Sequence, residues 1–251
     1  VADQLANAIQ NARLFEQLNT SLTESEMQTE VSMAINEAKS VEEIARAASQ
    51  IGEFIGMESV SLRYFTHWDA DGAPLLQDVF GIIRDNGDSE LRQQRNASVD
   101  QELLGWFFSD AQQARRAPTS GALSVFKNLS AEPDIPETLR QNLLEQGYQS
   151  LIMASLNARN RLLGFLTFYS QNPVDDLPAR YVQVFVRTLI DEVASGLDRF
   201  ILLQESERRA ARMETAFEIS RQAASMLDEQ TLLAQAAELI RERFGFYYVG
   251  I

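Results

Sequence analysis

The residues with the clearest chemical potential lie in the segment HWDADG, residues 67–72. His67 is the single histidine, and a lone imidazole can serve as a general base or as a haem ligand. The turn-forming pair Asp71-Gly72 instead favours a place in a hairpin turn with no chemical role for His67. The acidic residues begin like a calcium-binding loop, but the third acidic position and the distal Glu of that loop are missing. We therefore predict no metal site.

Signatures of common enzyme classes are missing from the sequence. It contains no GxGxxG, GxxxxGK[ST], HExxH or GxSxG pattern, which are typical of dinucleotide, phosphate, zinc and hydrolase sites. The 251 residues also include no cysteine, which excludes disulfides, thiolate metal sites, thiol nucleophiles and thioether-linked cofactors. We expect a chain that is not an enzyme and holds no cofactor, in a reducing, cytoplasmic setting.

Three adjacent aromatic residues, Trp106, Phe107 and Phe108, suggest a binding surface. Consecutive side chains on a helix cannot all face one core, so some must cover the sheet, line a cavity or meet a partner. Small-molecule sites combine apolar walls with a few polar groups, which polar strand residues beneath such a lid would supply. The candidate ligand-binding residues are Arg63, Trp106, Phe107, Phe126, Asn128, Ser150 and Thr167.

Two alternatives stay open for this candidate site. The aromatic residues could form a lid that packs on the sheet without any ligand. Each polar candidate could equally be an exposed strand residue, because a register slip of one residue moves a side chain to the opposite face of a sheet.

Charge and hydropathy exclude two classes of partner. The 36 acidic residues exceed the 22 basic ones by 14, and such a surface repels nucleic-acid phosphates and anionic lipid headgroups. No stretch approaches the roughly 18 consecutive apolar residues that a membrane span needs. The longest apolar run, LLGFLTFY at 162–169, suits a strand. We expect a soluble segment with no nucleic-acid partner and no membrane span.

The two ends of the chain resemble each other in sequence. ADQLANAIQNARL from Ala2 aligns with IDEVASGLDRFIL from Ile190, and the segment from Ser40 aligns with the segment from Glu229. Chance similarity between amphipathic helices is the alternative, but the shared register continues through helix, glycine and strand. An internal repeat of this kind has to be found before domain boundaries are assigned.

The repeat predicts three parts. Residues 1–27 would be the closing helix and linker of a preceding unit, 28–203 a complete domain, and 204–251 a linker helix with the start of the next unit. The last segment, FYYVGI at 246–251, reads as a strand. Because isolated strands are not stable in water, this strand would need a partner from outside the segment.

Two long helices would connect these parts. Residues 2–38 contain no Gly or Pro, and apolar residues recur at three- and four-residue steps. Residues 178–226 contain a single glycine, Gly196, and have a comparable pattern. Each helix has a polar centre, at 23–30 and at 204–212, so each is predicted to cross solvent between two packed ends.

Between the connectors, the pattern predicts an alternation of helices and strands. A helix over 41–54 would be capped by Ser40 together with Glu43. The residues from Arg84 to Ser98 are mostly polar and predict a loop. The remaining expected elements are strands over 58–66, 75–83, 121–129, 148–157 and 161–171, and helices near 99–114 and 136–146.

The sequence ADQLANAIQNARLFEQ, residues 2–17, resembles the closing helix of GAF domains, and LLAQAAELIRERFGFYYVGI, residues 232–251, resembles their opening helix and first strand. The order of elements between them is similar as well. The resemblance implies an α+β fold, GAF-like and related to PAS. Such a fold has a central antiparallel sheet of about six strands, a helical layer on one face, a ligand pocket on the other, and long connecting helices on either side.

The resemblance also implies a function. GAF domains sit in series ahead of histidine kinase, cyclase or phosphodiesterase outputs and often dimerise through their connecting helices. We therefore expect a regulatory, sensory segment of a bacterial signalling protein that forms a homodimer through helices 2–38 and 178–226 and contacts neighbouring signalling domains of its own chain. The alternative is a ligand-free dimerisation spacer.

The ligand is not specified by the resemblance. The Asn-Lys-Phe-Asp-Glu pattern of cyclic-nucleotide-binding GAF domains is not matched, because Lys127-Asn128 and Asp175-Asp176 have neither its order nor its spacing. GAF domains that attach bilins, and the methionine sulfoxide reductases of this fold, require cysteines that this chain lacks.

Overall fold

The computed structural model describes residues 2–85, 88–107, 123–132, 135–174, 182–224 and 229–245. The chain divides into two compact units, residues 1–200 and 201–251. The elements of the first unit are α1 (Ala2–Glu37), α2 (Val41–Phe54), β1 (Ser59–Trp68), β2 (Pro74–Asp85), β3 (Asp88–Ser98), α3 (Gln101–Phe107), β4 (Leu123–Phe126), η1 (Leu129–Ala131), α5 (Glu137–Glu145), β5 (Ser150–Ala158), β6 (Arg161–Ser170) and η2 (Val182–Val186). Helix α7 (Arg187–Ala224) passes from the first unit into the second, which also contains α8 (Glu229–Phe244).

The first unit is built on a six-stranded sheet with the strand order β3-β2-β1-β6-β5-β4, in which every neighbouring pair is antiparallel. The hairpin between β5 and β6 turns through Arg159 and Asn160, which have positive φ angles of 50° and 61°. Two successive residues with positive φ angles give the turn the twist that an antiparallel hairpin favours. The α+β class and the antiparallel sheet predicted from the sequence are confirmed.

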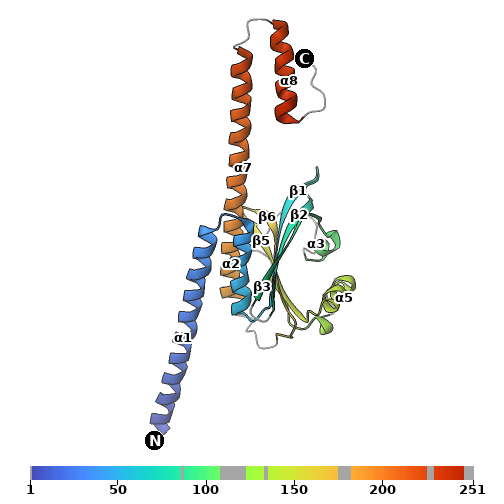
Figure 1. The fold of residues 1–251 in the computed structure, drawn as a ribbon. Helices are drawn as coiled ribbons and strands as arrows, with labels where there is room; N and C mark the ends of the chain where they lie inside the picture. Colours follow the sequence, from blue (N-terminus) through green and yellow to red (C-terminus); the bar gives the residue numbers. More distant parts are fainter. Residues whose placement is uncertain are drawn as a thin grey trace. The chain divides into compact units, whose positions relative to one another are not determined.

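One face of the sheet is covered by helices (Figure 1). Alternate residues of the central strands, among them Leu62 and Phe168, are fully buried on this face. Helix α2 contributes a stripe of buried residues that includes Ile44 and Ile51, and it begins at Ser40, whose hydroxyl accepts a hydrogen bond from the backbone N–H of Glu43 at 3.2 Å. The start of α7 adds buried apolar residues to the same layer: Leu189, Val193 and Leu197.

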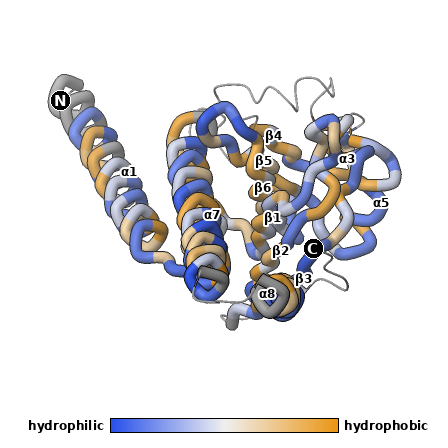
Figure 2. The backbone as a smooth tube through the Cα atoms, turned by 90° about the horizontal axis from the view of Figure 1, so that it is seen from above, coloured by the Kyte–Doolittle hydropathy of each residue, from blue (hydrophilic) through white to orange (hydrophobic). Residues whose placement is uncertain are grey.

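The opposite face carries a second apolar cluster beneath α3 and α5, which we call the sheet-face cluster. In Figure 2, α3 and α5 flank one face of β5, β6 and β1, and the chain of β5 and β6 is predominantly hydrophobic. The cluster consists of Phe65, Val99, Leu103, Leu104, Leu129, Ile135, Leu143, Leu151, Met153, Leu162, Phe165 and Tyr169. Both faces of the sheet are therefore covered.

Helices α1 and α7 contact each other closely, and we call this contact the α1–α7 junction. Gly196 lies against the side chain of Ile35, with no room for a Cβ atom between them. Arg199 donates to the Asn36 side-chain oxygen and to the Ile35 carbonyl, each at 2.9 Å. Glu192 accepts hydrogen bonds from Ser32 and Gln28 of α1. The helix that enters the domain is thus joined to the helix that leaves it.

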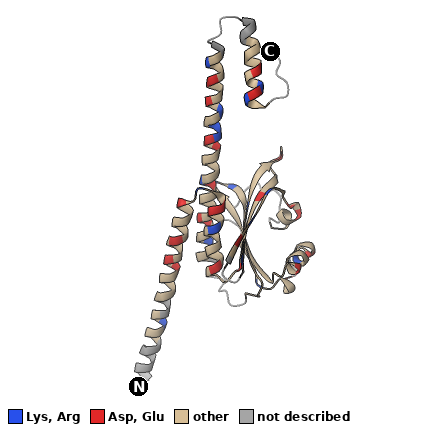
Figure 3. Cartoon of the chain, viewed as in Figure 1, with Lys and Arg blue, Asp and Glu red and all other residues tan. Residues whose placement is uncertain are grey.

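The second unit contains the charged part of α7 and helix α8. Acidic and basic residues are mixed along this part of α7 (Figure 3), and Glu205 pairs with Arg209 at 3.8 Å. Arg243 of α8 pairs with Glu218 of α7 at 3.1 Å. The strand predicted over 246–251 lies outside the described residues. None of the helices described is long and apolar enough to cross a membrane.

The prediction of a polar loop over 84–98 is wrong. The end of β2 and the whole of β3 lie in this range, and β3 pairs with β2 from Leu76↔Ser98 to Asp85↔Asp88. Because β3 is an edge strand with a largely exposed surface, its sequence shows no alternation of apolar and polar residues.

The structure describes parts of the two helices predicted over 178–226 and near 99–114. The described part of the outgoing helix begins with a π-helical turn at Val182–Val186, and regular α-helix starts at Arg187. Helix α3 ends at Phe107, and residues 108–122 lie outside the described ones.

Candidate ligand site on the covered face of the sheet

The strand register decides which candidate side chains share a face. Arg63 of β1 lies opposite Phe165 of β6, and Ser61 lies opposite Thr167. Partners in adjacent strands project to the same side of a sheet, and residues two apart in one strand do as well. Arg63, Ser61 and Thr167 therefore lie on the face of Phe165, which is the face of the sheet-face cluster.

The aromatic candidates come together above this face. Trp106 and Phe107 of α3 and Phe126 of β4 all pack against the sheet-face cluster. The rings of Trp106 and Phe126 are 5.4 Å apart, and Phe107 meets Phe165 edge to face at 5.3 Å. Trp106 and Phe107, two of the three residues of the predicted lid, thus lie over this face together with Phe126, while Phe108 lies outside the described residues.

Two hydroxyl groups on this face have no hydrogen-bond partner. Ser61 is 7% exposed and Thr167 is 2% exposed, and neither side-chain oxygen makes a hydrogen bond. A buried polar group without a partner costs about 1–3 kcal/mol, so most such groups in folded proteins are satisfied. A pair of them on adjacent strands is a site where a bound molecule can gain hydrogen bonds.

Arg63 lies two residues from Ser61 and is half-buried. Its guanidinium donates to the hydroxyl of Tyr169 at 3.2 Å, and no carboxylate among the described residues pairs with it. The Tyr169 ring in turn stacks on Tyr148 at 4.8 Å. The face therefore combines a cation, three hydroxyl groups and a wall of aromatic rings.

Two of the sequence candidates are not part of this arrangement. Ser150 lies opposite Ser170 and projects to the same side of β5 as Ile152, which is the helix-covered face. Its hydroxyl donates to the Asn172 carbonyl at 2.8 Å. Asn128 caps the short helix η1, where its side-chain oxygen accepts from the Ser130 N–H. The expected place of Ser150 beneath the lid is wrong, because its strand parity could not be assigned from the sequence. The side-chain oxygen of Asn128 is engaged in its cap.

Sequence reasoning also missed Ser61, Tyr148 and Tyr169. Ser61 has the parity of Arg63 in β1, and Tyr169 has the parity of Thr167 in β6. The alternation rule would have identified both once their neighbours had been selected. Tyr148 precedes β5, and its stacking on Tyr169 has no signature in the local sequence.

The predicted turn forms after Trp68, while His67 and Trp68 are the last residues of β1. The Asp69 carboxylate accepts hydrogen bonds from the backbone N–H groups of Asp71 and Ala73, and Gly72 has a positive φ of 82°. The carboxylate is thus engaged with its own turn. His67 is exposed at the end of β1, where its Nδ1 lies 3.2 Å from the Thr66 hydroxyl.

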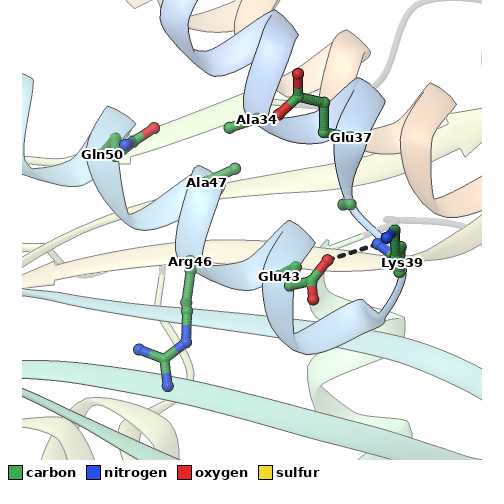
Figure 4. Close-up of a pocket in the computed structure, with 8 residues that line it drawn as sticks. Ala34, Glu37, Lys39, Glu43, Arg46, Ala47 and Gln50 are labelled. Atoms are coloured by element: carbon green, nitrogen blue, oxygen red, sulfur yellow. Dashed lines mark hydrogen bonds between the residues drawn. The ribbon is translucent and has the colours of Figure 1, made fainter.

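A hollow of about 690 Å³ lies on the other side of the sheet, between the end of α1 and α2 (Figure 4). Two of its polar side chains are engaged, since Glu43 accepts from the Lys39 N–H at 2.6 Å and Arg46 pairs with the neighbouring Glu42 at 3.0 Å. Gln50, by contrast, has a buried and unpaired side-chain oxygen. Three alanines form much of the wall, so the hollow offers few groups for recognition.

A smaller hollow of about 380 Å³ lies at the α1–α7 junction and includes Asp191 and Arg199. Burial raises the pKa of Asp191, and the nearby Arg187 acts in the opposite direction. This carboxylate belongs to the junction rather than to the sheet-face site.

No family model and no curated protein matches the chain. Its fold is similar to that of two solved phytochrome structures. The bacteriophytochrome RpBphP3 from the photosynthetic bacterium R. palustris is 12% identical, with a TM-score of 0.56 over 90% of this chain and 46% of the other. The phytochrome photosensory core module of Stigmatella aurantiaca is 14% identical, with a TM-score of 0.56 over 88% of this chain and 45% of the other.

The chain spans less than half the length of both phytochrome structures. At these identities the likeness concerns the fold. The fold class predicted from the sequence, a GAF-like α+β domain with a central six-stranded antiparallel sheet and long connecting helices, is confirmed.

Proposed function

We propose that this chain is a non-catalytic sensory segment of a bacterial signalling protein. Its complete GAF-type domain, residues 28–203, binds a small molecule on the sheet-face side and relays the binding event through α1 and α7. The observation that carries the proposal is the placement of the candidate site and of the helical layer on opposite faces of the same strands. Ser61 and Leu62 are neighbours in β1, yet one faces the candidate site and the other the helices.

This placement supplies a route for coupling. Protein interiors are close-packed and transmit displacement, so a molecule that shifts β1 or β6 also displaces the residues behind them. Phe168, on the helix side of β6, contacts Gly52 of α2, where an added Cβ would lie 3.2 Å from the Phe168 ring. A ligand can shift this packing only by its difference in affinity between two arrangements.

The α1–α7 junction is the element that would receive the shift. Ile35, Asn36 and Ser32 of α1 are tied to α7 by one close contact and a set of hydrogen bonds. Because both helices lead out of the domain, a change at the junction would reach the neighbouring signalling domains. A histidine kinase is the output that we propose.

The fold likeness to phytochromes supports a sensory role, because the S. aurantiaca structure is described as a photosensory core module. The chain itself contains no cysteine for a thioether-linked chromophore. We propose a reversibly bound small molecule in place of an attached cofactor.

A homodimer in the cytoplasm completes the proposal. Helix α1 exposes large apolar side chains at Leu14, Leu18 and Leu22, which are 50–69% exposed and four residues apart. This spacing places them along one side of the helix, where a second copy could cover them.

A spacer without a ligand is the second candidate function. It is favoured by the contacts of Trp106 and Phe107, which already pack on the sheet-face cluster as a lid would. A spacer would use the same helices for dimerisation, and nothing would bind between the sheet and α3.

A thermal-shift screen with nucleotides, haem, bilins and small metabolites separates the two functions. A ligand at 100 times its Kd stabilises the folded state by about 2.7 kcal/mol, which raises the Tm of a domain of this size by roughly 5–10 °C. The Phe126→Ala variant should lose this response, whereas Phe15→Ala, which removes an exposed aromatic ring of α1, should keep it. A uniformly silent screen would leave the spacer as the function.

A further inference from the structure

The two unpaired hydroxyls of Ser61 and Thr167 face each other across the β1–β6 ladder. Directly opposed residues have Cβ atoms about 4.5–5.5 Å apart, so one small group can contact both oxygens. Each hydroxyl can donate as well as accept, which allows the pair to bind a group rich in acceptor oxygens.

Arg63 differs in its partners from several arginines of the described part of the domain. Arg84, Arg92, Arg140 and Arg159 each pair with a carboxylate. Arg63 is half-buried and makes a single hydrogen bond, to a neutral phenol. A buried charge is normally paired, because taking it out of water is costly unless a counter-charge lies beside it. The counter-charge for Arg63 is not supplied by the described residues.

The register places these groups around one point. Along β6, Thr167 lies between Phe165 and Tyr169, and Arg63 sits opposite Phe165. The hydrogen bond from Arg63 to Tyr169 therefore spans the position of the Ser61–Thr167 pair. Residues two apart in a strand are separated by about 6.8 Å, so the guanidinium, the Tyr169 hydroxyl and the two unpaired hydroxyls lie within one small patch of the sheet.

We infer that the ligand of the proposed sensory domain carries an oxyanion, and that Arg63, Ser61, Thr167 and Tyr169 bind it. The guanidinium provides the counter-charge and paired N–H donors. The hydroxyls of Ser61 and Thr167 supply further donors. The Tyr169 O–H supplies another, and its oxygen already accepts a hydrogen bond from Arg63. The oxyanion is the carboxylate or phosphate of a molecule whose apolar body lies against the aromatic wall formed by Phe107, Phe165 and Tyr148.

This inference rests on the proposed function, because it names the chemical class of the molecule that the same site binds. A buried water molecule is the competing occupant. Water would satisfy Ser61 and Thr167 but would leave the charge of Arg63 without a counter-ion. If an oxyanion occupies the site, the charge of a ligand determines its affinity. If water occupies the site, charged and neutral ligands do not differ.

Matched fluorinated probes test the inference by ¹⁹F NMR: 4-fluorobenzoate, 4-fluorophenyl phosphate and neutral 4-fluorobenzamide. We expect saturable binding of at least one of the two anions, at least tenfold tighter than that of the amide. Tighter binding of the benzoate would identify a carboxylate ligand, and tighter binding of the phenyl phosphate would identify a phosphate ligand.

Arg63→Met should weaken the preferred anion at least tenfold and leave the amide unchanged. The matched control is Arg46→Met, which removes the same charge from α2 on the opposite side of the sheet, where the guanidinium is already paired with Glu42 at 3.0 Å. Arg46→Met should leave all affinities within twofold of the wild-type values. A Ser61→Ala, Thr167→Val double variant should weaken the anion while retaining the charge of Arg63.

Circular dichroism and the thermal unfolding midpoint establish that each variant is folded. Arg63→Lys retains the charge and keeps the test valid if Arg63→Met fails to fold. Equal binding of the amide and the anions, or an unchanged anion affinity in folded Arg63→Met, would overturn the oxyanion inference and leave the sensory function standing. Failure of all three probes and of the broader thermal-shift screen would overturn both.

Discussion

The Gly196→Ala substitution tests whether the α1–α7 junction is packed as tightly as the structure indicates. A Cβ atom at position 196 would lie well inside van der Waals contact with Cγ2 of Ile35, a side chain that is 3% exposed. The two carbons would have to separate by more than about 1 Å to reach the optimal distance of roughly 3.5–4.0 Å. A branched side chain such as Ile35 cannot swing away easily, so the helices themselves must move apart.

Two opposing contributions set the magnitude of the effect. Replacing glycine by alanine inside a helix stabilises it by about 1 kcal/mol, whereas overpacking a buried contact costs about 1–3 kcal/mol. We expect Gly196→Ala to lower the free energy of unfolding by about 1 kcal/mol, measured by urea denaturation. Gly105→Ala in α3 is the control, because a Cβ there meets no atom within 4 Å, and it should raise stability instead.

A double-mutant cycle isolates the contact. Ile35→Ala alone should cost about 2–5 kcal/mol, since it empties a buried site. In combination with Gly196→Ala the total loss should be smaller than the sum, because the smaller side chain leaves room for the new methyl group. Stability of Gly196→Ala equal to that of Gly105→Ala, or strictly additive losses in the cycle, would refute the close contact between the helices.

Three further predictions concern other parts of the domain. Gly164→Ala should prevent stable folding, as judged by circular dichroism, because its Cβ would lie 2.7 Å from the Tyr64 Cα in the adjacent strand; a native spectrum would contradict this. Asp191→Asn should raise the Tm at pH 7 slightly, since partial burial of this surface carboxylate raises its folded-state pKa and makes the ionised form less favourable. The gain should disappear as the pH falls through that raised pKa toward the ordinary range of aspartate, and a gain that persisted in acid would argue against it. Light scattering should find a homodimer that the Leu18→Glu, Leu22→Glu variant converts to monomer, and a monomeric wild-type protein at high concentration would exclude the dimer.

The sequence predicted the parts of the fold that rest on local chemistry. Ser40 and Glu43 specify the start of α2, and the run of apolar residues around Phe165 specifies a buried strand. β3 was missed because an edge strand with one neighbour does not need alternating hydrophobicity, and residues such as Gln93 and Gln94 appear equally often in loops.

Only part of the candidate site could be predicted from the sequence. Trp106 and Phe126 were identifiable by their size and clustering, and the structure brings them together. The polar residues depended on strand register, which the sequence leaves undetermined by one residue. Thr167 was therefore placed on the correct face and Ser150 on the wrong one. Ser61 is identified as a candidate only from the structure, where its unpaired hydroxyl lies opposite Thr167.

Hydrogen exchange measures whether binding on one face of the sheet changes the helices on the other. Deuterium uptake would be compared with and without the tightest of the fluorinated probes, with Arg63→Met under the same conditions as the control. We expect altered protection in residues 28–37 and 187–199, which form the α1–α7 junction, and no such change in the variant. Changes confined to β1, β6 and α3, with the junction unaffected, would contradict this expectation.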